Sequence, residues 1–335
     1  MKEKGLSMKK IFKIFLVCMM ILTVTACSGG NESSDTATKI KWNKENKFAD
    51  LISFKIEAID QTKMITPDVI GTLYTYFEPA DSKNVLLDLT MWITNVTDSN
   101  LKLNDEIEAI FTIDNTEYVA SLLASKDNGG SLTSDVSLEA NTANKVHYYV
   151  EVDPEKLDQK IEFSLNTKVE EDSDENKKSA TLDFELKDAK ENYEAKNLND
   201  VITFDGYSEM TLQAANIAKE VAPASPVGLY TYYKVNDENN SFVDFTTVVK
   251  NISGSDIMAS NIATVNLLDV NNNPYPATVV YEKDDHSNLE AASSLTLKND
   301  QSAIIHYIFE VGDDVVNEAK SIRISRQGKV YIINI

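Results

Sequence analysis

The chain is short of cysteine, and this excludes several kinds of site. Its two cysteines, Cys18 and Cys27, both lie near the N-terminus, and the remainder of the 335 residues contains none. That remainder can form no disulfide framework, no thiolate nucleophile and no cysteine-based metal site. Its stability therefore has to come from an apolar core alone.

Basic residues are also few. Lysine and arginine together number 32 against 53 aspartates and glutamates, which gives a formal net charge of −21. Residues 1–26 carry five lysines and one glutamate, so a net charge of −25 remains on the rest of the chain. Binding to phosphates or to anionic lipid headgroups needs clustered basic side chains. The charge balance argues against nucleic acid as a partner and favours a soluble, acidic surface.

Histidine is scarce, and the catalytic signatures built on it are missing. The chain has three histidines and no Ser-His-Asp order, nucleophile elbow, phosphate loop or HExxH sequence. His147 and His306 are each followed four residues later by a glutamate, Glu151 and Glu310. On an extended strand such side chains lie roughly 13 Å apart, too far to share one ion. We therefore predict no metal site and no catalytic residue, and interpret these positions as an exposed strand face beside core tyrosines.

One segment of the chain occurs twice. Gly71–Asn95 and Gly228–Asn251 share the pattern Leu-Tyr-Thr-Tyr, followed by an alternating run that ends in asparagine. From Tyr74 and Tyr230 to Asn95 and Asn251 the offset is 156 residues, and the later pair His147 and His306 is offset by 159. Matches over such lengths indicate an internal duplication, with a small net insertion in the second copy.

Within each copy the apolar residues recur at every second position, as in Leu87, Leu89 and Met91. This period indicates half-buried antiparallel strands, and turn sequences such as Asn128–Gly130 separate them. Helical periodicity is nearly absent. About seven to nine short strands per copy, among them Leu73–Phe77, predict an all-β protein with two tandem immunoglobulin-like antiparallel β-sandwich domains.

The N-terminus has the layout of an export signal. Basic residues within 9–13 precede the apolar run Ile14–Val24, which is too short to span a membrane. The sequence Val-Thr-Ala-Cys that ends at Cys27 resembles the bacterial lipobox. This resemblance implies cleavage after Ala26 and a covalent diacylglycerol lipid on Cys27, and no other cofactor is expected. A plain secretory signal is the alternative.

Composition divides the chain into five parts. Small polar residues follow the signal and cannot bury enough surface to order the chain, which predicts a flexible tether. The predicted parts are a lipoprotein signal peptide at 1–26, the tether at 27–39, one sandwich domain at 40–187, a linker at 188–200 and the other sandwich domain at 201–335.

The lipobox, the two sandwich repeats and the strand-and-turn sequence that ends at Asn95 and at Asn251 together resemble immunoglobulin-like lipoproteins of Gram-positive bacteria. That family is poorly characterised. The resemblance covers nearly the whole chain after the signal. It implies a lipid-anchored position on the extracytoplasmic face of the cell membrane, and it carries no catalytic residues.

Tyrosines at equivalent positions of the two copies are the candidate binding residues. Tyr74 and Tyr76 in the first copy correspond to Tyr230 and Tyr232 in the second. Alternation places each pair on one face of a strand, and tyrosine offers a large contact area at low entropy cost. The two interpretations are a face that binds a ligand or partner, and cross-strand packing.

Other suggestive sequences have a structural explanation. Asp269–Asn273 begins like a calcium loop, but Pro274 stands where that loop needs glycine, so a hairpin turn is expected. Asn95 and Asn251 each begin an Asn-x-Ser/Thr sequence, which we interpret as a strand-ending turn. The polar loop Glu282–Asn288 remains open as a weak calcium site.

These observations predict a non-enzymatic binding or interaction module on the bacterial surface. Its expected partners are the membrane, through the lipid anchor, and an unidentified envelope protein or wall polymer. The alternatives are a hydrolase that acts on wall polymers with scattered carboxylates and a structural spacer that holds another component away from the membrane.

Overall fold

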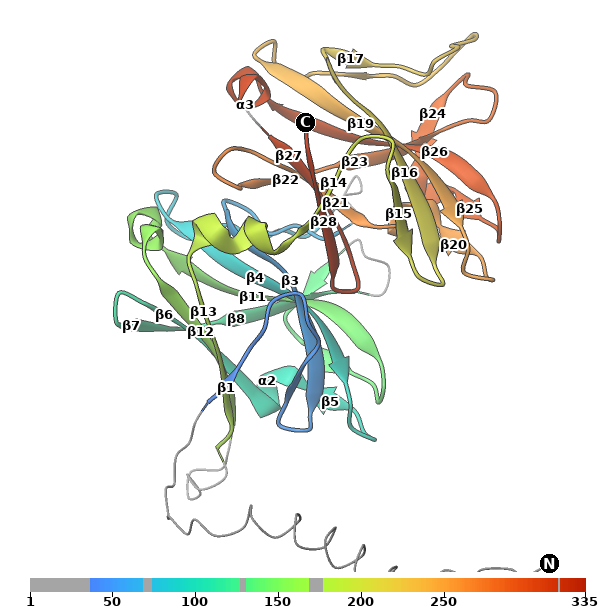
Figure 1. Ribbon diagram of the computed structural model, residues 1–335. Coiled ribbons are helices and arrows are strands. Elements are labelled where there is room, and N and C mark those ends of the chain that lie inside the picture. Colours follow the sequence, from blue (N-terminus) through green and yellow to red (C-terminus); the bar gives the residue numbers. More distant parts are fainter. Residues whose placement is uncertain (1–36, 69–73, 127–130, 169–176, 319) are drawn as a thin grey trace, which may run out of the picture. The chain divides into compact units, whose positions relative to one another are not determined.

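The computed structural model describes residues 37–68, 74–126, 131–168, 177–318 and 320–335 (Figure 1). Residues Ala37–Ile335 form one compact unit, apart from Met1–Thr36. The expected signal peptide, the cleavage position after Ala26, the lipidated Cys27 and the tether up to Thr36 therefore lie outside the described residues. No helix in the described part is long and apolar enough to cross a membrane.

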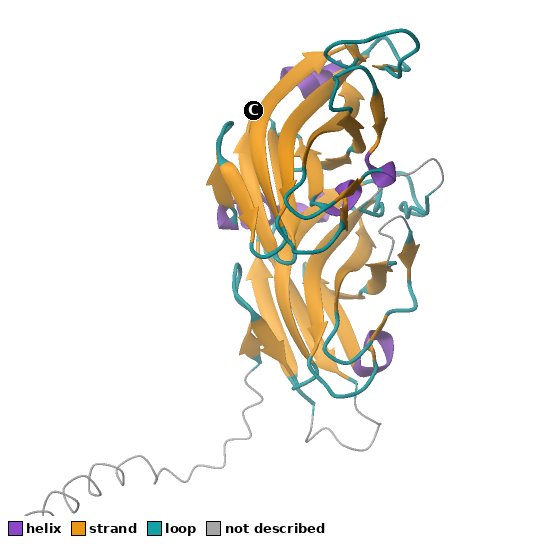
Figure 2. Cartoon of the chain, turned by 90° about the vertical axis from the view of Figure 1, so that its right-hand side faces the viewer, coloured by secondary structure: helices purple, strands orange, loops and turns teal. Residues whose placement is uncertain are grey.

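Strands make up most of this unit, and its helices are short (Figure 2). The strands fall into two consecutive groups, residues 38–184 and 194–334, and every sheet is built within one group. The helix η3 (Leu186–Asn192) connects the groups. The prediction of an all-β fold is confirmed.

In the first group, a six-stranded and a five-stranded sheet share one core. The six-stranded sheet has the order β2 (Asn46–Phe48), β3 (Ile52–Thr62), β4 (Val85–Asn95), β11 (Ala143–Val152), β8 (Ser121–Ser125) and β9 (Leu132–Thr133). The five-stranded sheet has the order β1 (Thr38–Lys39), β13 (Ser179–Phe184), β12 (Ile161–Thr167), β6 (Ile107–Ile113) and β7 (Thr116–Val119). The remaining elements are the ribbon of β5 (Leu101–Lys102) with β10 (Ser137–Leu138), and the helices α2 (Leu103–Glu106) and η1 (Pro154–Asp158).

Aromatic side chains from both sheets meet in this core. Phe111 of β6 and Phe163 of β12 have ring centroids 5.0 Å apart, and Tyr148 of β11 lies 6.0 Å from Phe163. Buried and half-buried residues alternate along β6, as the period-two pattern requires. Burying one large apolar side chain stabilises a fold by about 1.5–3 kcal/mol. This apolar core therefore stabilises the sandwich without any disulfide.

The second group repeats the arrangement. Its six-stranded sheet has the order β15 (Val201–Phe204), β16 (Ser208–Ala218), β19 (Asn240–Asn251), β26 (Ser302–Gly312), β23 (Thr278–Glu282) and β24 (Leu289–Ala291). Its five-stranded sheet has the order β14 (Glu194–Lys196), β28 (Lys329–Asn334), β27 (Ser321–Arg326), β21 (Thr264–Leu268) and β22 (Pro274–Pro276). The remaining elements are the ribbons β17 (Glu220–Val221) with β18 (Tyr233–Lys234) and β20 (Ile257–Met258) with β25 (Thr296–Leu297), and the helices η4 (Ala259–Asn261), η5 (Ala292–Ser294) and α3 (Asp313–Asn317).

The central strands of the two groups match residue by residue. Thr90 of β4 pairs with His147 of β11, and in the second group Thr246 of β19 pairs with His306 of β26. A bulge also interrupts β3 and β16 at equivalent places. The tandem β-sandwich fold predicted from the duplication is confirmed, and below the groups are called the first and second sandwich.

Two stretches differ from the expectation. The described part of the expected strand Leu73–Phe77 forms a single bridge, between Phe77 and Ile65, because β-propensity gives a strand only where a neighbour pairs along its length. The expected linker at 188–200 contains the end of η3 and the short β14, which pairs in parallel with β28. A strand of three residues is too short for periodicity to reveal.

The turns expected at Asn95, Asn251 and Asp269–Asn273 are confirmed, and the turn expected at Asn128–Gly130 lies outside the described residues. Asn95 is fully buried, and its Nδ2 donates to the carbonyl oxygen of Leu138 at 2.9 Å while its Oδ1 accepts from the Thr97 amide at 2.9 Å. Asn251 makes the equivalent bonds in the second sandwich. Asp269 accepts from the backbone amides of the turn between β21 and β22, so the sequence that begins like a calcium loop is a hairpin turn.

Candidate functional site

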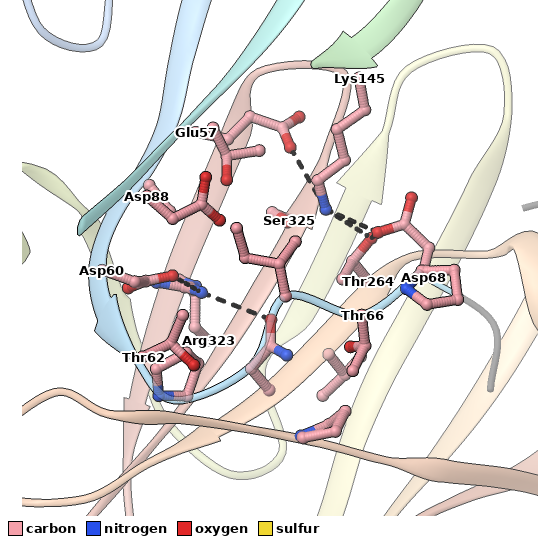
Figure 3. Close-up of a pocket in the computed structure, with 18 of the residues that line it drawn as sticks. Glu57, Asp60, Thr62, Thr66, Asp68, Asp88, Lys145, Thr264, Arg323 and Ser325 are labelled. Atoms are coloured by element: carbon pink, nitrogen blue, oxygen red, sulfur yellow. Dashed lines mark hydrogen bonds and ion pairs between the residues drawn. The ribbon is translucent and has the colours of Figure 1, made fainter. Parts of the chain in front are cut away.

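Polar residues of the two sandwiches meet at a junction that encloses a cavity of about 60 Å³ (Figure 3). The first sandwich contributes side chains from β3, β4, β11 and the segment 64–68. The second contributes side chains from β21, β22, β23 and β27. The carboxylates that line the cavity all belong to the first sandwich, and Lys145 and Arg323 neutralise part of their charge.

A buried ion pair crosses the junction. Arg323 of β27 donates from Nη1 to Oδ1 of Asp60 and from Nη2 to Oδ2, each at 2.6 Å, and both side chains are only 6% exposed. Burial opposes the charge on the guanidinium, but the Asp60 carboxylate outweighs it and raises the pKa of Arg323. Burial raises the pKa of nearby Tyr193, which follows η3, to about 12. Two parallel hydrogen bonds fix the relative orientation of the partners more strictly than a single contact would.

A second set of contacts crosses the junction through Lys145 of β11. Its Nζ lies 2.7 Å from Oδ1 of Asp68 and 3.9 Å from Oε2 of Glu57. Nζ also lies 3.3 Å from Oγ1 of Thr264 in β21, which donates to the same Asp68 oxygen at 3.0 Å. Burial would lower the pKa of Lys145, but the carboxylates of Asp68 and Glu57 raise it. Lys145 therefore remains charged and connects the sandwiches through Asp68 and Thr264.

The hairpin between β27 and β28 provides a third contact. Its two residues, Gln327 and Gly328, have φ angles of 49° and 75°, the left-handed values that a tight two-residue hairpin needs. The amide of Gly328 donates to Oε1 of Glu57 at 2.6 Å. A Cβ on Gly328 would lie 2.5 Å from Cβ of Lys55 in the first sandwich, so only glycine allows this approach.

The junction residues are not repeated by the duplication. The equivalent positions carry Gln213 for Glu57, Asn216 for Asp60, Ala224 for Asp68, Ile304 for Lys145 and Ser164 for Arg323. Each of these charged residues on its own is typical of a solvated surface, so the sequence did not predict this site. The signal that reveals it is a charge difference between two otherwise matching repeats.

Glu57 gives the junction a defined pH dependence. Burial raises its pKa above the ordinary 4.5, against the opposing effects of Lys145 and the Gly328 amide. A group with a raised folded pKa contributes stability that is present below its unfolded pKa and lost as the pH rises through the folded value. Ionised Glu57 therefore costs stability at neutral pH.

We expect Glu57→Gln to be more stable than the parent protein at pH 7, with an advantage that shrinks as the pH falls to about 4.5. The glutamine keeps an oxygen that can accept from Gly328. Urea denaturation at both pH values measures the difference. Glu117→Gln at an exposed carboxylate is the control and should show no such trend. A pH-independent difference, or a less stable Glu57→Gln protein at pH 7, would contradict the prediction.

The two histidines on equivalent strands are buried, which corrects the exposed strand face expected for them. His147 is 6% exposed, and its Nδ1 lies 2.8 Å from Oδ2 of Asp88 in β4. His306 Nδ1 lies 3.0 Å from Asp244 in the same arrangement. Residues on both faces of these central strands are covered, so alternation alone could not tell inside from outside. The neighbouring tyrosines are core residues, as predicted.

These His–Asp pairs do not have the geometry of a catalytic triad. In a triad the acid bonds to Nδ1 and the nucleophile faces Nε2. Here both Asp88 and the hydroxyl of Thr90 face Nδ1 of His147, and among the described residues its Nε2 has no hydrogen-bond partner. The described residues also contain no group of three or more acidic, histidine or cysteine side chains that could hold a metal ion.

The candidate tyrosines form two matching pairs at the surface. The ring centroids of Tyr74 and Tyr76 are 6.0 Å apart with a tilt of 55°, and those of Tyr230 and Tyr232 are 6.1 Å apart with the same tilt. Tyr76 and Tyr232 are each 52% exposed. The four rings lie outside any strand, so cross-strand packing does not account for them. None of the four rings lines the junction cavity, although Tyr74 follows the junction residue Asp68 by only six residues.

Comparisons with known proteins add the following. No known protein family and no curated protein matches this chain. An uncharacterized β-sandwich protein from Clostridium difficile is 16% identical, with a TM-score of 0.39 over 43% of this chain and 95% of that one. A conserved hypothetical protein from Bacillus anthracis is 15% identical, with a TM-score of 0.30 over 42% of this chain and 94% of that one. A Bacillus subtilis protein described as a candidate lipoprotein is 18% identical, with a TM-score of 0.27 over 45% of this chain and 41% of that one. The likeness concerns the β-sandwich fold and nothing further.

Proposed function

We propose that this protein is a lipid-anchored surface protein, attached through Cys27 on the extracytoplasmic face of the cell membrane, and that its two sandwiches act as a non-enzymatic binding module. The observation that carries the proposal is the recurrence of one exposed tyrosine pair, with the same ring geometry, in both sandwiches.

Exposed aromatic pairs are suited to binding. A tyrosine at the surface presents a large rigid ring and a hydroxyl, and it loses little entropy when a partner covers it. The segments that carry the pairs are also anchored: the amide of Leu132 donates to Oγ1 of Thr75 at 2.8 Å, and the amide of Thr231 donates to Oδ1 of Asn288 at 2.6 Å. Two anchored sites on one chain can engage a repetitive partner together, which raises the apparent affinity without new contacts.

The carboxylate hydrolase is the weaker alternative. Glycosidases use two carboxyl groups that flank an accessible substrate bond. At the junction, Asp60 and Asp68 are engaged by Arg323 and Lys145, and Glu57 is 2% exposed. These groups connect the sandwiches and leave no open pair of carboxyls there, which supports a binding role.

Site-specific photocrosslinking tests the binding role. A benzoylphenylalanine placed at Tyr76 or at Tyr232 should crosslink the same neighbour in intact cells, and mass spectrometry should identify an envelope protein or wall fragment. Val119 in β7, which is 66% exposed, is the control position and should give no such product.

The outcomes separate the alternatives. Products at the tyrosines that are absent at Val119 support the proposal. Equal products at all three positions indicate random encounter and contradict it. If no position yields a product and only shortening of the chain impairs the cells, the spacer function replaces it.

A further inference from the structure

A groove with a volume of about 610 Å³ runs beside the junction. The first sandwich lines it with Trp92 of β4, Ser125 of β8 and Asn144 of β11, and the second with Asn261 of η4 and Arg326 of β27. Pockets for small ligands typically measure about 300–1,000 Å³ and often lie where two domains meet. Because both sandwiches contribute, this groove exists only when they are docked.

Arg326 is held in a fixed position in one wall of the groove. Its guanidinium carbon lies 3.3 Å from the ring centroid of Tyr207, which also lines the groove. Its Nη1 donates to the backbone oxygen of Asn261 at 2.6 Å, and the Tyr207 hydroxyl donates to the same oxygen at 3.1 Å. Among the described residues, the buried Nε of Arg326 has no hydrogen-bond partner. Because protein atoms enclose this Nε, Arg326 offers the groove the side of a guanidinium stacked on Tyr207 and not a free Nε donor.

The charges of the groove largely cancel. Glu57 and Asp68 line its inner end together with Lys145, and these three pair with one another. The remaining ionic side chains along its lining are Lys126, Glu139 and Arg326. On a chain with a net charge of −21, a groove with this balance attracts neither a strongly cationic nor a strongly anionic ligand.

The rest of the lining consists mainly of hydroxyl and amide side chains beside two aromatic rings. The hydroxyl and amide residues are Ser125, Ser137, Thr142, Asn144, Ser260, Asn261, Thr264, Ser325 and Gln327. Such groups both donate and accept hydrogen bonds, which matches a ligand covered with hydroxyls. The half-buried Trp92 offers a flat apolar face for the C–H side of a ring. A bound peptide would instead use a free strand edge or apolar pockets for its side chains, and this lining offers little of either.

We propose that this groove binds an uncharged oligosaccharide. Trp92 stacks against one sugar ring, while Asn144 and Asn261 exchange hydrogen bonds with its hydroxyls and the stacked Arg326 and Tyr207 form the wall beside it. This site adds to the proposed binding function and does not depend on the tyrosine pairs or on the lipid anchor.

Tryptophan fluorescence can report on the groove directly. The chain has two tryptophans, and Trp42 packs at the core of the first sandwich, so Trp42→Phe leaves Trp92 as the only tryptophan, which excitation at the red edge of the absorption band selects over the tyrosines. Addition of cellohexaose or chitohexaose to this protein should change the emission saturably, with a midpoint below about 1 mM. The two sugars distinguish a plain glucan from an N-acetylated glycan, and a response to either supports the proposal.

A variant of the groove completes the test. Asn261→Ala removes the side-chain amide but keeps the backbone oxygen that Arg326 and Tyr207 use, and it should weaken binding about three- to tenfold. Its thermal melting shows whether the fold is intact. Tyr76→Ala with Tyr232→Ala should leave sugar binding unchanged, so failure here is distinct from failure of the crosslinking proposal.

Several results would overturn the assignment. One is the absence of any emission change with both sugars up to about 10 mM, a concentration at which even weak binding saturates. Another is an unchanged midpoint in correctly folded Asn261→Ala. An equal response to a hexapeptide of glycine and serine would replace the oligosaccharide by a peptide ligand.

Discussion

Arg323→Ala is expected to lower the free energy of unfolding by about 3–5 kcal/mol, because it leaves the Asp60 carboxylate buried without its partner. Both hydrogen bonds of this carboxylate to Arg323 are 2.6 Å long, and water reaches neither side chain readily. An exposed ion pair would contribute less than about 1 kcal/mol. Urea denaturation of the variant and the parent protein measures the difference.

A double substitution separates the loss of the ion pair from the cost of leaving the Asp60 carboxylate buried without a partner. Asp60→Asn combined with Arg323→Ser installs the residues that the other repeat carries at these positions, Asn216 and Ser164. It removes both charges, so we expect it to be more stable than Arg323→Ala alone. The coupling energy follows from the cycle of Asp60→Asn, Arg323→Ser and the double variant. A loss below about 1 kcal/mol for Arg323→Ala would show that the pair behaves as a surface contact.

Gly328→Ala is expected to destabilise the protein by about 2–5 kcal/mol, the sum of a left-handed backbone penalty and a steric clash. The new methyl group would meet Cβ of Lys55 at 2.5 Å, an atom close to the backbone that cannot swing away. Relief requires the hairpin to withdraw from the first sandwich, which also breaks the bond to Glu57.

A matched control exists for this substitution. Gly254 has a φ of 74°, close to the 75° of Gly328, but a Cβ there would meet nothing within 4 Å. Gly254→Ala should therefore cost only the backbone penalty of about 1–2 kcal/mol. Calorimetry of both variants gives the comparison, and it also shows whether the two sandwiches still unfold together. Equal losses at the two glycines would mean that the contact with Lys55 contributes nothing.

The sequence predicts the fold well because the relevant signals are local. The period-two run around Leu87 and Met91 indicates strands, and the turn residues Asn95 and Asn251 end them as expected. The duplication then transfers each element to the second half. Local signals do not predict the burial of His147, because burial depends on which segments cover a residue. They also predict a strand at Leu73–Phe77 that does not form, because a strand needs a neighbour that pairs with it.

The junction could not be predicted by these means. Asp60 and Arg323 are separated by 263 residues, and neither residue differs in kind from the many charged residues around it. Periodicity places Asp60 on a strand but does not show that another sandwich covers it. The candidate tyrosines stand out because they recur in both copies. The junction residues stand out only where the two copies carry different residues at equivalent positions.

The hairpin of Gln327 and Gly328 also limits how sandwiches of this kind can be joined to one another. In the first sandwich the corresponding connection, between β12 and β13, spans residues 168–178, and Ser164 stands in place of Arg323. The exposed side of the second sandwich offers Asn216 where Asp60 would be needed. A contact between unlike faces propagates into filaments when both faces stay available. Here the contacting faces are already covered within the same molecule, so this contact is not available to join one molecule to the next.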